Sequence, residues 1–219
     1  MRGRFEGSGM TSMRTRERLV SRLRDEGITD ESVLDAVRSV PRHIFVDEAL
    51  ASRAYEDIAL PIGMGQTISQ PFIVALMTQA TVAAPTPLRV LEVGTGCGYQ
   101  TAVLASLVSR VYTVERIELL LARARRRLRA LDVNNVWFKY GDGAAGWPEC
   151  APFDAALVTA APPRLPEKLV EQLVLGGRIV IPVGDSRRQW LKVFTRTESG
   201  VEEDTIADVS FVPMLRGKG

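Results

Sequence analysis

Glycines recur at every second position after an apolar run in residues 90–100, VLEVGTGCGYQ. Glycine has no Cβ, so such a loop can turn tightly and let a ligand approach the backbone closely. The apolar run predicts a strand, and the residues from Tyr99 onward predict a helix. Strand, glycine loop and helix together predict the first crossover of a nucleotide-binding α/β sheet, where ligands lie beyond the carboxyl end of the strand. A tight turn that binds nothing is the alternative for the loop taken alone.

Two acidic residues indicate which ligand the loop suits. Glu92 lies near the end of the strand, and Glu115 ends the next predicted strand, about 20 residues beyond Gly94. A carboxylate at that spacing can accept hydrogen bonds from both ribose hydroxyls of an adenosine. The full pattern is E-x-G-x-G-x-G, with Tyr99 where a dinucleotide fingerprint has its third glycine. It resembles the S-adenosylmethionine (AdoMet) site of class I methyltransferases better than a nicotinamide site.

Two further strand ends are expected at the same edge of the sheet, because the carboxyl ends of parallel strands lie together. Asp142 and Gly143 follow one predicted strand, and residues 159–163 follow another. We predict that the Asp142 carboxylate accepts the adenine amino group and that a backbone N–H at Gly143 faces the ring. A plain Asp-Gly turn is the alternative for this pair.

The segment 161–164, Ala-Pro-Pro-Arg, bears on the methyl acceptor. Methyltransferases that act on an amide or an exocyclic amine often have Asn or Asp, two prolines and an aromatic residue at this place. Here the prolines are present, whereas the hydrogen-bonding side chain and the aromatic are absent. The segment therefore argues against methylation of nucleic-acid bases or of glutamine.

The elements that must position these residues alternate regularly along the chain. Repeated strand–helix units predict a doubly wound, mostly parallel sheet with helices on both faces, that is, an α/β Rossmann-like fold of the class I methyltransferase type. Residues 190–197 and 205–213 alternate like a C-terminal antiparallel hairpin. The predicted strands are 89–94, 110–115, 136–140, 154–159 and 177–184, and the predicted helices are 14–26, 30–40, 72–82, 99–107, 117–131 and 166–175.

The N-terminal part precedes this alternation. Residues 1–13 are predicted to be a disordered extension, in which Met10 and Met13 are alternative starts. Residues 14–219 are predicted to form a single methyltransferase domain, with N-terminal helices and an active-site loop in 14–82 and the Rossmann-like core in 88–219. The loop itself, residues 60–71 with the sequence LPIGMGQTISQP, is polar between apolar runs. It suits either a binding loop or a polar connection.

Composition narrows the classes of function. A length of 219 residues with 46% hydrophobic and 25% charged residues is typical of one globular domain. A net charge of +2 does not indicate a nucleic-acid partner, and the arginines of helix 14–26 are read as a solvated face. Cys97 and Cys150 lack metal-ligand spacing, and no metal is expected. Free thiols and the lack of a signal peptide or long apolar span predict a cytoplasmic protein without membrane contact.

A longer set of motifs resembles one family, the bacterial protein-L-isoaspartate O-methyltransferases. LPIGMGQTISQP, VLEVGTGCGYQTA, YTVER, GDG, FDAALVTAAPP, GGRIVIPVG and FVPML occur in the family's order and spacing. The resemblance covers residues 15–215, and GQTISQP is its most specific element. Cys97, where a serine is common, and Met214 are mild departures.

The resemblance implies an enzyme that methylates the α-carboxylate of L-isoaspartyl residues in damaged proteins, with AdoMet as donor and S-adenosyl-L-homocysteine as product. It implies that Ser69 is the catalytic residue, which we interpret as a hydrogen-bond donor to the substrate carboxylate. That carboxylate is ionised at neutral pH, so no general base is required. The cofactor-binding residues implied are Gln66, Thr67, Ile68, Ser69, Glu92, Gly94, Thr95, Gly96, Gly98, Glu115, Arg116, Asp142, Gly143 and Thr159.

Two other functions remain compatible with the sequence. One is a methyltransferase for a small carboxylate or for RNA, which only the arginine-rich helices support. The other is a non-catalytic adenosine-binding module. No exposed apolar seam stands out in the sequence, so a monomer is expected.

Overall fold

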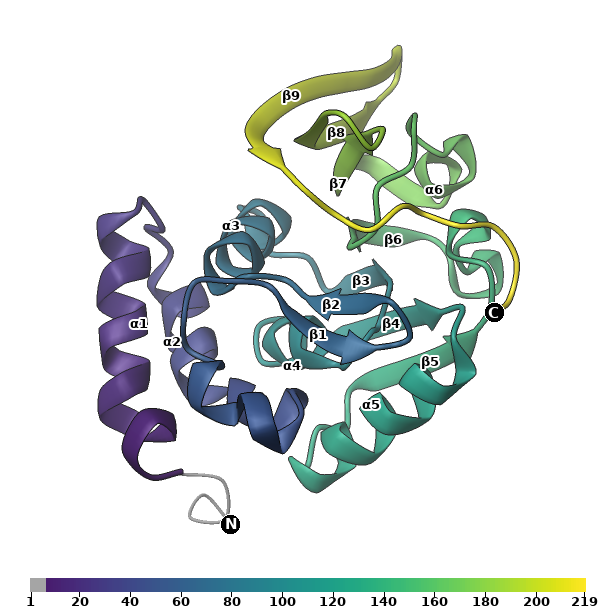
Figure 1. Ribbon diagram of the computed structural model, residues 1–219. Helices are drawn as coiled ribbons and strands as arrows, with labels where there is room; N and C mark the ends of the chain where they lie inside the picture. The colour runs from purple at the N-terminus through teal and green to yellow at the C-terminus, as the bar shows by residue number, and fades with distance from the viewer. Residues whose placement is uncertain (1–6) are drawn as a thin grey trace.

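Seven strands form one sheet, in the order β5-β4-β3-β6-β7-β8-β9, in the computed structural model, which describes residues 7–219 (Figure 1). The first five strands of that order are parallel, and β8 and β9 are antiparallel at one edge. The predicted fold class is confirmed. The strands are β3 (Arg89–Val93), β4 (Arg110–Glu115), β5 (Val136–Tyr140), β6 (Phe153–Val158), β7 (Leu173–Gly184), β8 (Gln189–Thr197) and β9 (Gly200–Val209).

The central strands are apolar on both sides because both faces of the sheet are covered. Successive side chains of a strand point to opposite faces. Val90 of β3 and Val111 of β4 therefore belong to one buried cluster, whereas Leu91 and Val114 belong to another. Two separate hydrophobic cores thus fix β3 and β4 at the middle of the molecule, which makes their carboxyl ends a rigid platform.

The helices cover the two faces unequally. α3, α4 and α5 pack in the first cluster together with α1 and α2, whereas α6 packs in the second. The helices are α1 (Met13–Asp25), α2 (Glu31–Ser39), α3 (Pro71–Val82), α4 (Tyr99–Ala105), α5 (Glu118–Ala130) and α6 (Glu167–Glu171). α2 begins where expected, because the Asp30 side chain accepts hydrogen bonds from the N–H groups of Ser32 and Val33.

Within the predicted extension 1–13, residues 1–6 lie outside the described residues. The remainder contains a short 3-10 helix, Gly9–Thr11, and α1 begins at Met13. The Ser8 N–H donates to the Thr11 hydroxyl, and that hydroxyl donates back to the Ser8 carbonyl, which closes the turn.

The segment that we expected to be a polar loop forms a hairpin instead. β1 (Leu60–Gly63) and β2 (Gln66–Ile68) pair antiparallel as a separate two-stranded sheet. Three consecutive residues with positive φ, Gly63 at 88°, Met64 at 54° and Gly65 at 69°, make the turn between the strands. Leu60 and Ile68 are buried against the core, which turns the polar side chains of β2 away from it.

The C-terminal third differs from its predicted boundaries at three places. α6 ends at Glu171 rather than residue 175, because β7 already begins at Leu173 and includes Gly176 in a positive-φ conformation. β9 begins at Gly200, earlier than expected, and ends at Val209. Residues 210–213, which were expected to continue that strand, leave the sheet.

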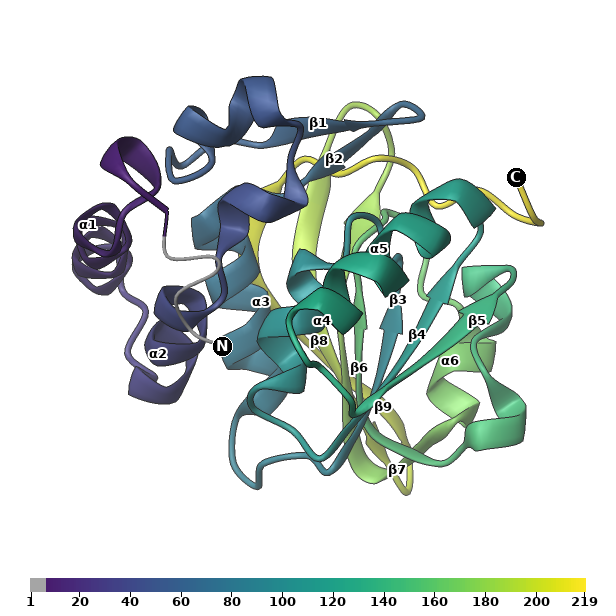
Figure 2. The same ribbon diagram turned by 90° about the horizontal axis from the view of Figure 1, so that it is seen from below.

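The β1–β2 hairpin and the segment that follows β9 both lie at the carboxyl edge of the parallel strands. Figure 2 shows β1 and β2 beside the tips of β3 and β4, with the segment after β9 crossing the same edge. This segment, residues 210–215, is called the strap below. The Ala161 N–H donates to the Val212 carbonyl, and the Met214 N–H donates to the Ala161 carbonyl, so the strap is attached to the loop after β6.

Candidate active site

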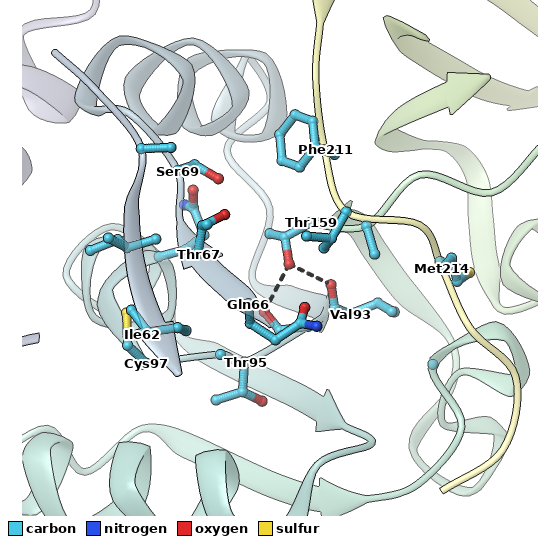
Figure 3. Close-up of a pocket in the computed structure, with 18 of the residues that line it drawn as sticks. Ile62, Gln66, Thr67, Ser69, Val93, Thr95, Cys97, Thr159, Phe211 and Met214 are labelled. Atoms are coloured by element: carbon cyan, nitrogen blue, oxygen red, sulfur yellow. Dashed lines mark hydrogen bonds between the residues drawn. The ribbon is translucent and has the colours of Figure 1, made fainter. Parts of the chain in front are cut away.

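A cavity of about 460 Å³ opens between the strand ends, the hairpin and the strap. The ends of β3 and β4 form one side of it, and β2 and the strap form the other (Figure 3). The position is the crevice beyond the carboxyl ends of the strands, where open α/β sheets bind ligands. The volume suits one ligand of drug-like size.

The glycine loop has a backbone that another residue could not adopt. Gly94 has φ 96°, and a Cβ there would lie 2.2 Å from the Thr159 hydroxyl oxygen. That hydroxyl donates to the carbonyls of Val93 (3.1 Å) and Gly94 (2.9 Å) and so ties the end of β6 to the end of β3. Thr159 therefore shapes the cradle with its side chain while it also lines the cavity.

Glu115 holds the loop from the neighbouring strand. Its carboxylate is buried and accepts hydrogen bonds from the N–H groups of Gly96 (2.8 Å) and Ile117 (2.9 Å). A carboxylate has about four acceptor positions, so two remain for a ligand. Glu115 and Gly96 both line the cavity, which suits the predicted contact with ribose hydroxyls.

Glu92 is placed differently from its predicted role, because it does not line the cavity. It is fully buried, and one of its oxygens accepts from the hydroxyls of Thr101 and Thr113, each at 2.6 Å. Thr113 in turn accepts from Thr95, a cavity residue, at 2.6 Å. Burial raises the Glu92 pKa to about 8 from its usual 4.5. Glu92 thus reaches the cavity only through two threonine hydroxyls.

Asp142 also lies outside the cavity lining, whereas Gly143 and Arg116 lie within it. The two oxygens of Asp142 accept from the N–H groups of Ala144 and Gly217, each at 2.9 Å. The first bond caps the 3-10 helix Gly143–Ala145, so Asp142 has a structural role in this turn, and its contact with adenine stays a prediction. A Cβ at Gly143 would lie 2.4 Å from Val93, which shows how closely the backbone packs at this end.

The hairpin supplies the polar groups of the opposite side. Gln66, Thr67, Ile68 and Ser69 all line the cavity, and the Ser69 hydroxyl points toward Phe211 across it (Figure 3). A hydroxyl group therefore faces an aromatic ring across the cavity (Figure 3).

The strap was missed as a site element by the strand prediction, although the motif FVPML marked it. Phe211, Val212, Pro213, Met214 and Leu215 line the cavity. Gln189 holds Phe211 by its backbone, since the side-chain amide donates to the Phe211 carbonyl (3.1 Å) and accepts from its N–H (2.6 Å). Nothing in the sequence around Gln189 indicated that its side chain would hold the backbone of Phe211.

The structure brings most of the predicted site residues together. Those that line the cavity are Gln66, Thr67, Ile68, Ser69, Gly94, Thr95, Gly96, Glu115, Arg116, Gly143 and Thr159. Glu92, Gly98 and Asp142 do not. Gly98 instead allows close packing of α4 on α5, because a Cβ there would lie 3.1 Å from that of Ala124.

The residues present fit AdoMet. A glycine cradle that a Cβ would fill and a buried carboxylate with free acceptor positions are suited to an adenosine and its ribose. Gly94, Gly96 and Glu115 would hold that part. Within residues 7–219, no group of three or more His, Cys, Asp or Glu side chains could hold a metal ion. No helix in the same range is long and apolar enough to cross a membrane.

Sequence comparison places the chain among close relatives. The profile of the family described as Protein-L-isoaspartate(D-aspartate) O-methyltransferase (PCMT) matches residues 14–219. A protein named protein-L-isoaspartate O-methyltransferase from Halorhodospira halophila is 59% identical over 212 residues, 97% of this chain and 96% of its own length. The protein of the same name from Hahella chejuensis is 59% identical over 208 residues, 95% of this chain and 99% of its own.

Two solved structures are similar over most of the chain. One, named protein-L-isoaspartate O-methyltransferase, has a TM-score of 0.82 at 33% identity, and the similarity covers 90% of this chain but 65% of that one. The other is a putative protein-L-isoaspartate O-methyltransferase from Plasmodium falciparum in complex with S-adenosyl-L-homocysteine. It has a TM-score of 0.81 at 27% identity, with 91% of this chain and 98% of that chain covered.

Proposed function

The chain belongs to the protein-L-isoaspartate(D-aspartate) O-methyltransferase family, and we propose that it methylates the free α-carboxylate of L-isoaspartyl residues in damaged proteins and peptides. The methyl donor is AdoMet. The methyl ester formed cyclises to a succinimide without enzymatic help, and hydrolysis of the succinimide partly restores L-aspartyl. The observation that carries this proposal is the meeting of the Ser69 hairpin and the glycine loop around one cavity.

Bound AdoMet supplies an electrophilic methyl group on a sulfonium. On the cofactor side, the backbone of Gly94 and Gly96 and the Glu115 carboxylate bind the adenosine part. On the acceptor side, the Ser69 hydroxyl donates a hydrogen bond to the isoaspartyl carboxylate and fixes the direction of its reacting oxygen. Phe211 forms the wall opposite Ser69 (Figure 3) and limits how far the acceptor can turn. Positioning of this kind supplies a large part of the rate acceleration in reactions between two bound groups.

No general base is needed, because the acceptor carboxylate is ionised at neutral pH. His43, the single histidine, does not line the cavity and so is not placed to act as a base there. Its Nδ1 lies 2.9 Å from the Tyr55 hydroxyl, outside the cavity lining, and burial lowers its pKa. A water-poor cavity also favours the reaction, since an anion and a sulfonium lose their charges as the bond forms.

The same proposal includes a monomeric, cytoplasmic enzyme that acts on protein and not on nucleic acid. It is supported by a net charge of +2 and by the free thiols Cys97 and Cys150. Light scattering during size-exclusion chromatography is expected to give a mass near 24.1 kDa. A mass of twice that value would contradict the monomer.

The function is tested with two synthetic peptides that differ only in one L-isoaspartyl or L-aspartyl residue. Each is incubated with the protein and radiolabelled AdoMet, and base-labile methyl ester is counted. Label on the isoaspartyl peptide alone is the expected result. Label on neither peptide, with AdoMet binding measured separately, would reject the acceptor and leave the cofactor site in place, and methyl incorporation into RNA would then identify a different methyltransferase.

A further inference from the structure

A fully buried arginine lies behind the acceptor side of the cavity. Arg42 belongs to the 3-10 helix Arg42–Phe45, between α2 and the hairpin, and its exposed fraction is 0%. It does not line the cavity. Arginine is among the residues least often buried completely, so the position calls for an explanation.

The guanidinium of Arg42 joins two segments by hydrogen bonds. Its Nη2 donates to the backbone carbonyl of Ser69 at 2.7 Å, and its Nε donates to the carbonyl of Ala54 at 2.8 Å. The first contact is to the residue whose hydroxyl enters the cavity. Two donors in a rigid planar fork fix the distance between those carbonyls more closely than one flexible ammonium would.

The same group also contacts the cofactor side. The guanidinium carbon lies 4.8 Å from the centre of the Tyr99 ring. Tyr99 is the first residue of α4, directly after the glycine loop, and it lines the cavity. Burial raises its pKa to about 12, so the ring stays a neutral phenol that can face a cation. One side chain therefore touches the backbone of Ser69 and the start of the helix that follows the glycine loop.

The contacts of Arg42 do not explain its burial by a gain in folding stability alone. Among the described residues, Arg42 forms no ion pair with a carboxylate, and its Nη1 has no hydrogen-bond partner. The Asp57 carboxylate acts on this charge without an ion pair, and a buried charge that is hydrogen-bonded only to carbonyls carries a desolvation cost that an apolar side chain would avoid. What the arginine adds, and an apolar side chain could not, is the fixed placement of the Ser69 carbonyl.

We propose that Arg42 is a positioning residue that fixes Ser69 relative to the start of α4, and thereby aligns the acceptor carboxylate with the methyl donor. The proposal rests on the proposed function, because it acts through the Ser69 hydroxyl. Arg42 would contribute to turnover without contacting either substrate. Its effect should therefore disappear when the Ser69 hydroxyl is removed.

A double-mutant cycle tests this coupling, with turnover of the isoaspartyl peptide and calorimetric AdoMet binding as the two readouts. Arg42→Lys keeps the charge but loses the two-pronged donor. We expect it to lower kcat about tenfold or more, with the AdoMet Kd within about twofold of the parent. In the Ser69→Ala background the same substitution should change kcat less than about twofold.

Arg125→Lys is the matched control. Arg125 also donates to a backbone carbonyl, that of Phe138 at 3.1 Å, and its guanidinium carbon lies 5.2 Å from the centre of the Phe138 ring, but it lies on α5 outside the cavity lining. Its substitution should leave kcat unchanged in both backgrounds. Arg42→Gln, which keeps one donor, repeats the cycle if Arg42→Lys does not fold.

Equal losses of kcat in both backgrounds would overturn the proposal, as would loss of AdoMet binding in both Arg42 variants, because either result makes Arg42 a general stabilising residue. The proposed function is judged separately in the same experiment. It depends on turnover by the parent enzyme and on the loss caused by Ser69→Ala alone, neither of which involves Arg42.

Discussion

The two sides of the cavity are built in different ways. The cofactor side consists of the ends of β3 and β4, which are inner strands of the seven-stranded sheet and lie between two hydrophobic cores. The acceptor side consists of Ser69, at the end of the β1–β2 hairpin, and of the strap; neither segment belongs to the ladder of that sheet. Gln66, Thr67 and Ile68 of the hairpin also line the cavity, and their contact with the cofactor stays a prediction. Figure 1 shows the β1–β2 hairpin in front of β3 and β4, and the yellow strap in front of β6.

The polar groups of the two sides are also held differently. On the cofactor side they support one another, as in the chain from Glu92 through Thr113 to Thr95. On the acceptor side, single buried side chains hold the backbone, Arg42 at Ser69 and Gln189 at Phe211. This difference indicates that cofactor binding and acceptor alignment are separable, so that substitutions on one side should leave the other intact.

The largest effect is expected from Glu115→Ala on the cofactor side. Two ribose hydroxyls would lose a charged acceptor, each bond being worth ~1.5–3 kcal/mol, and the Gly96 N–H would lose its partner. Calorimetric titration should show AdoMet affinity reduced by about a hundredfold or more. Glu118→Ala, an exposed acid in the first turn of α5, is the control and should bind normally. Unchanged affinity in Glu115→Ala would reject its contact with the ribose.

On the acceptor side, Ser69→Ala should lower kcat about 10- to 100-fold, the value of one hydrogen bond to a charged group. AdoMet affinity should stay within about twofold of the parent, because the glycine loop and Glu115 are untouched. Steady-state kinetics with the isoaspartyl peptide measures kcat, and calorimetry measures the AdoMet affinity. Ser52→Ala, at an exposed serine of the 3-10 helix Glu48–Arg53, should change neither. Full turnover in Ser69→Ala would remove the serine from its role.

The buried acid of the cofactor side should show in the pH dependence of stability. Because burial raises the Glu92 pKa to about 8, the folded protein holds a proton between pH 4.5 and 8 that the unfolded chain has released. The free energy of unfolding should therefore fall with rising pH across this window, by about 1.4 kcal/mol per pH unit at most. Glu92→Gln should lack this component. Parallel profiles of the two proteins in urea unfolding would contradict it.

The smallest effect is expected from Gln189→Leu, which removes both hydrogen bonds to Phe211. Net bonds of this kind are worth about 0.5–1.5 kcal/mol each, and water can replace one of the two at the edge of the cavity, so the peptide KM should rise by the value of one bond, about three- to tenfold, while AdoMet affinity is kept. Glu202→Gln, at an exposed position on β9, is the control. A loss of AdoMet affinity in Gln189→Leu would show that the strap also belongs to the cofactor side.

The sequence predicted the positions of residues best where they lie close together along the chain and in regular elements. Strand, glycine loop and the acid of the next strand occur within one crossover, so residue spacing alone predicted the places of Gly94, Gly96 and Glu115. The parallel direction of the main strands followed from the alternation of strands and helices. The family resemblance marked Ser69, which no rule of spacing would have singled out within LPIGMGQTISQP.

The sequence was less informative where distant segments decide the structure. The hairpin looked like a loop because β2 has three residues and Pro61 lies in β1, and proline is confined to edge strands or bulges. Residues 210–213 alternate like a strand, but Val212 accepts from the Ala161 N–H and Phe211 bonds to the Gln189 side chain. Glu92 and Asp142 were predicted to touch the cofactor. The Glu92 carboxyl group accepts from threonine hydroxyls and the Asp142 carboxylate accepts from backbone N–H groups, contacts that spacing does not reveal. A contact of either side chain with the cofactor stays a prediction.

The separability of the two sides is tested most directly by one measurement, the rate of isoaspartyl-peptide methylation against AdoMet concentration for the parent, Glu115→Ala and Ser69→Ala. We expect the rate of Glu115→Ala to approach the parent rate once AdoMet is saturating. We expect Ser69→Ala to reach half its maximal rate at the same AdoMet concentration as the parent, but to level off far below the parent rate. Two variants that both level off low, or a Ser69→Ala enzyme that excess AdoMet restores, would contradict the separation.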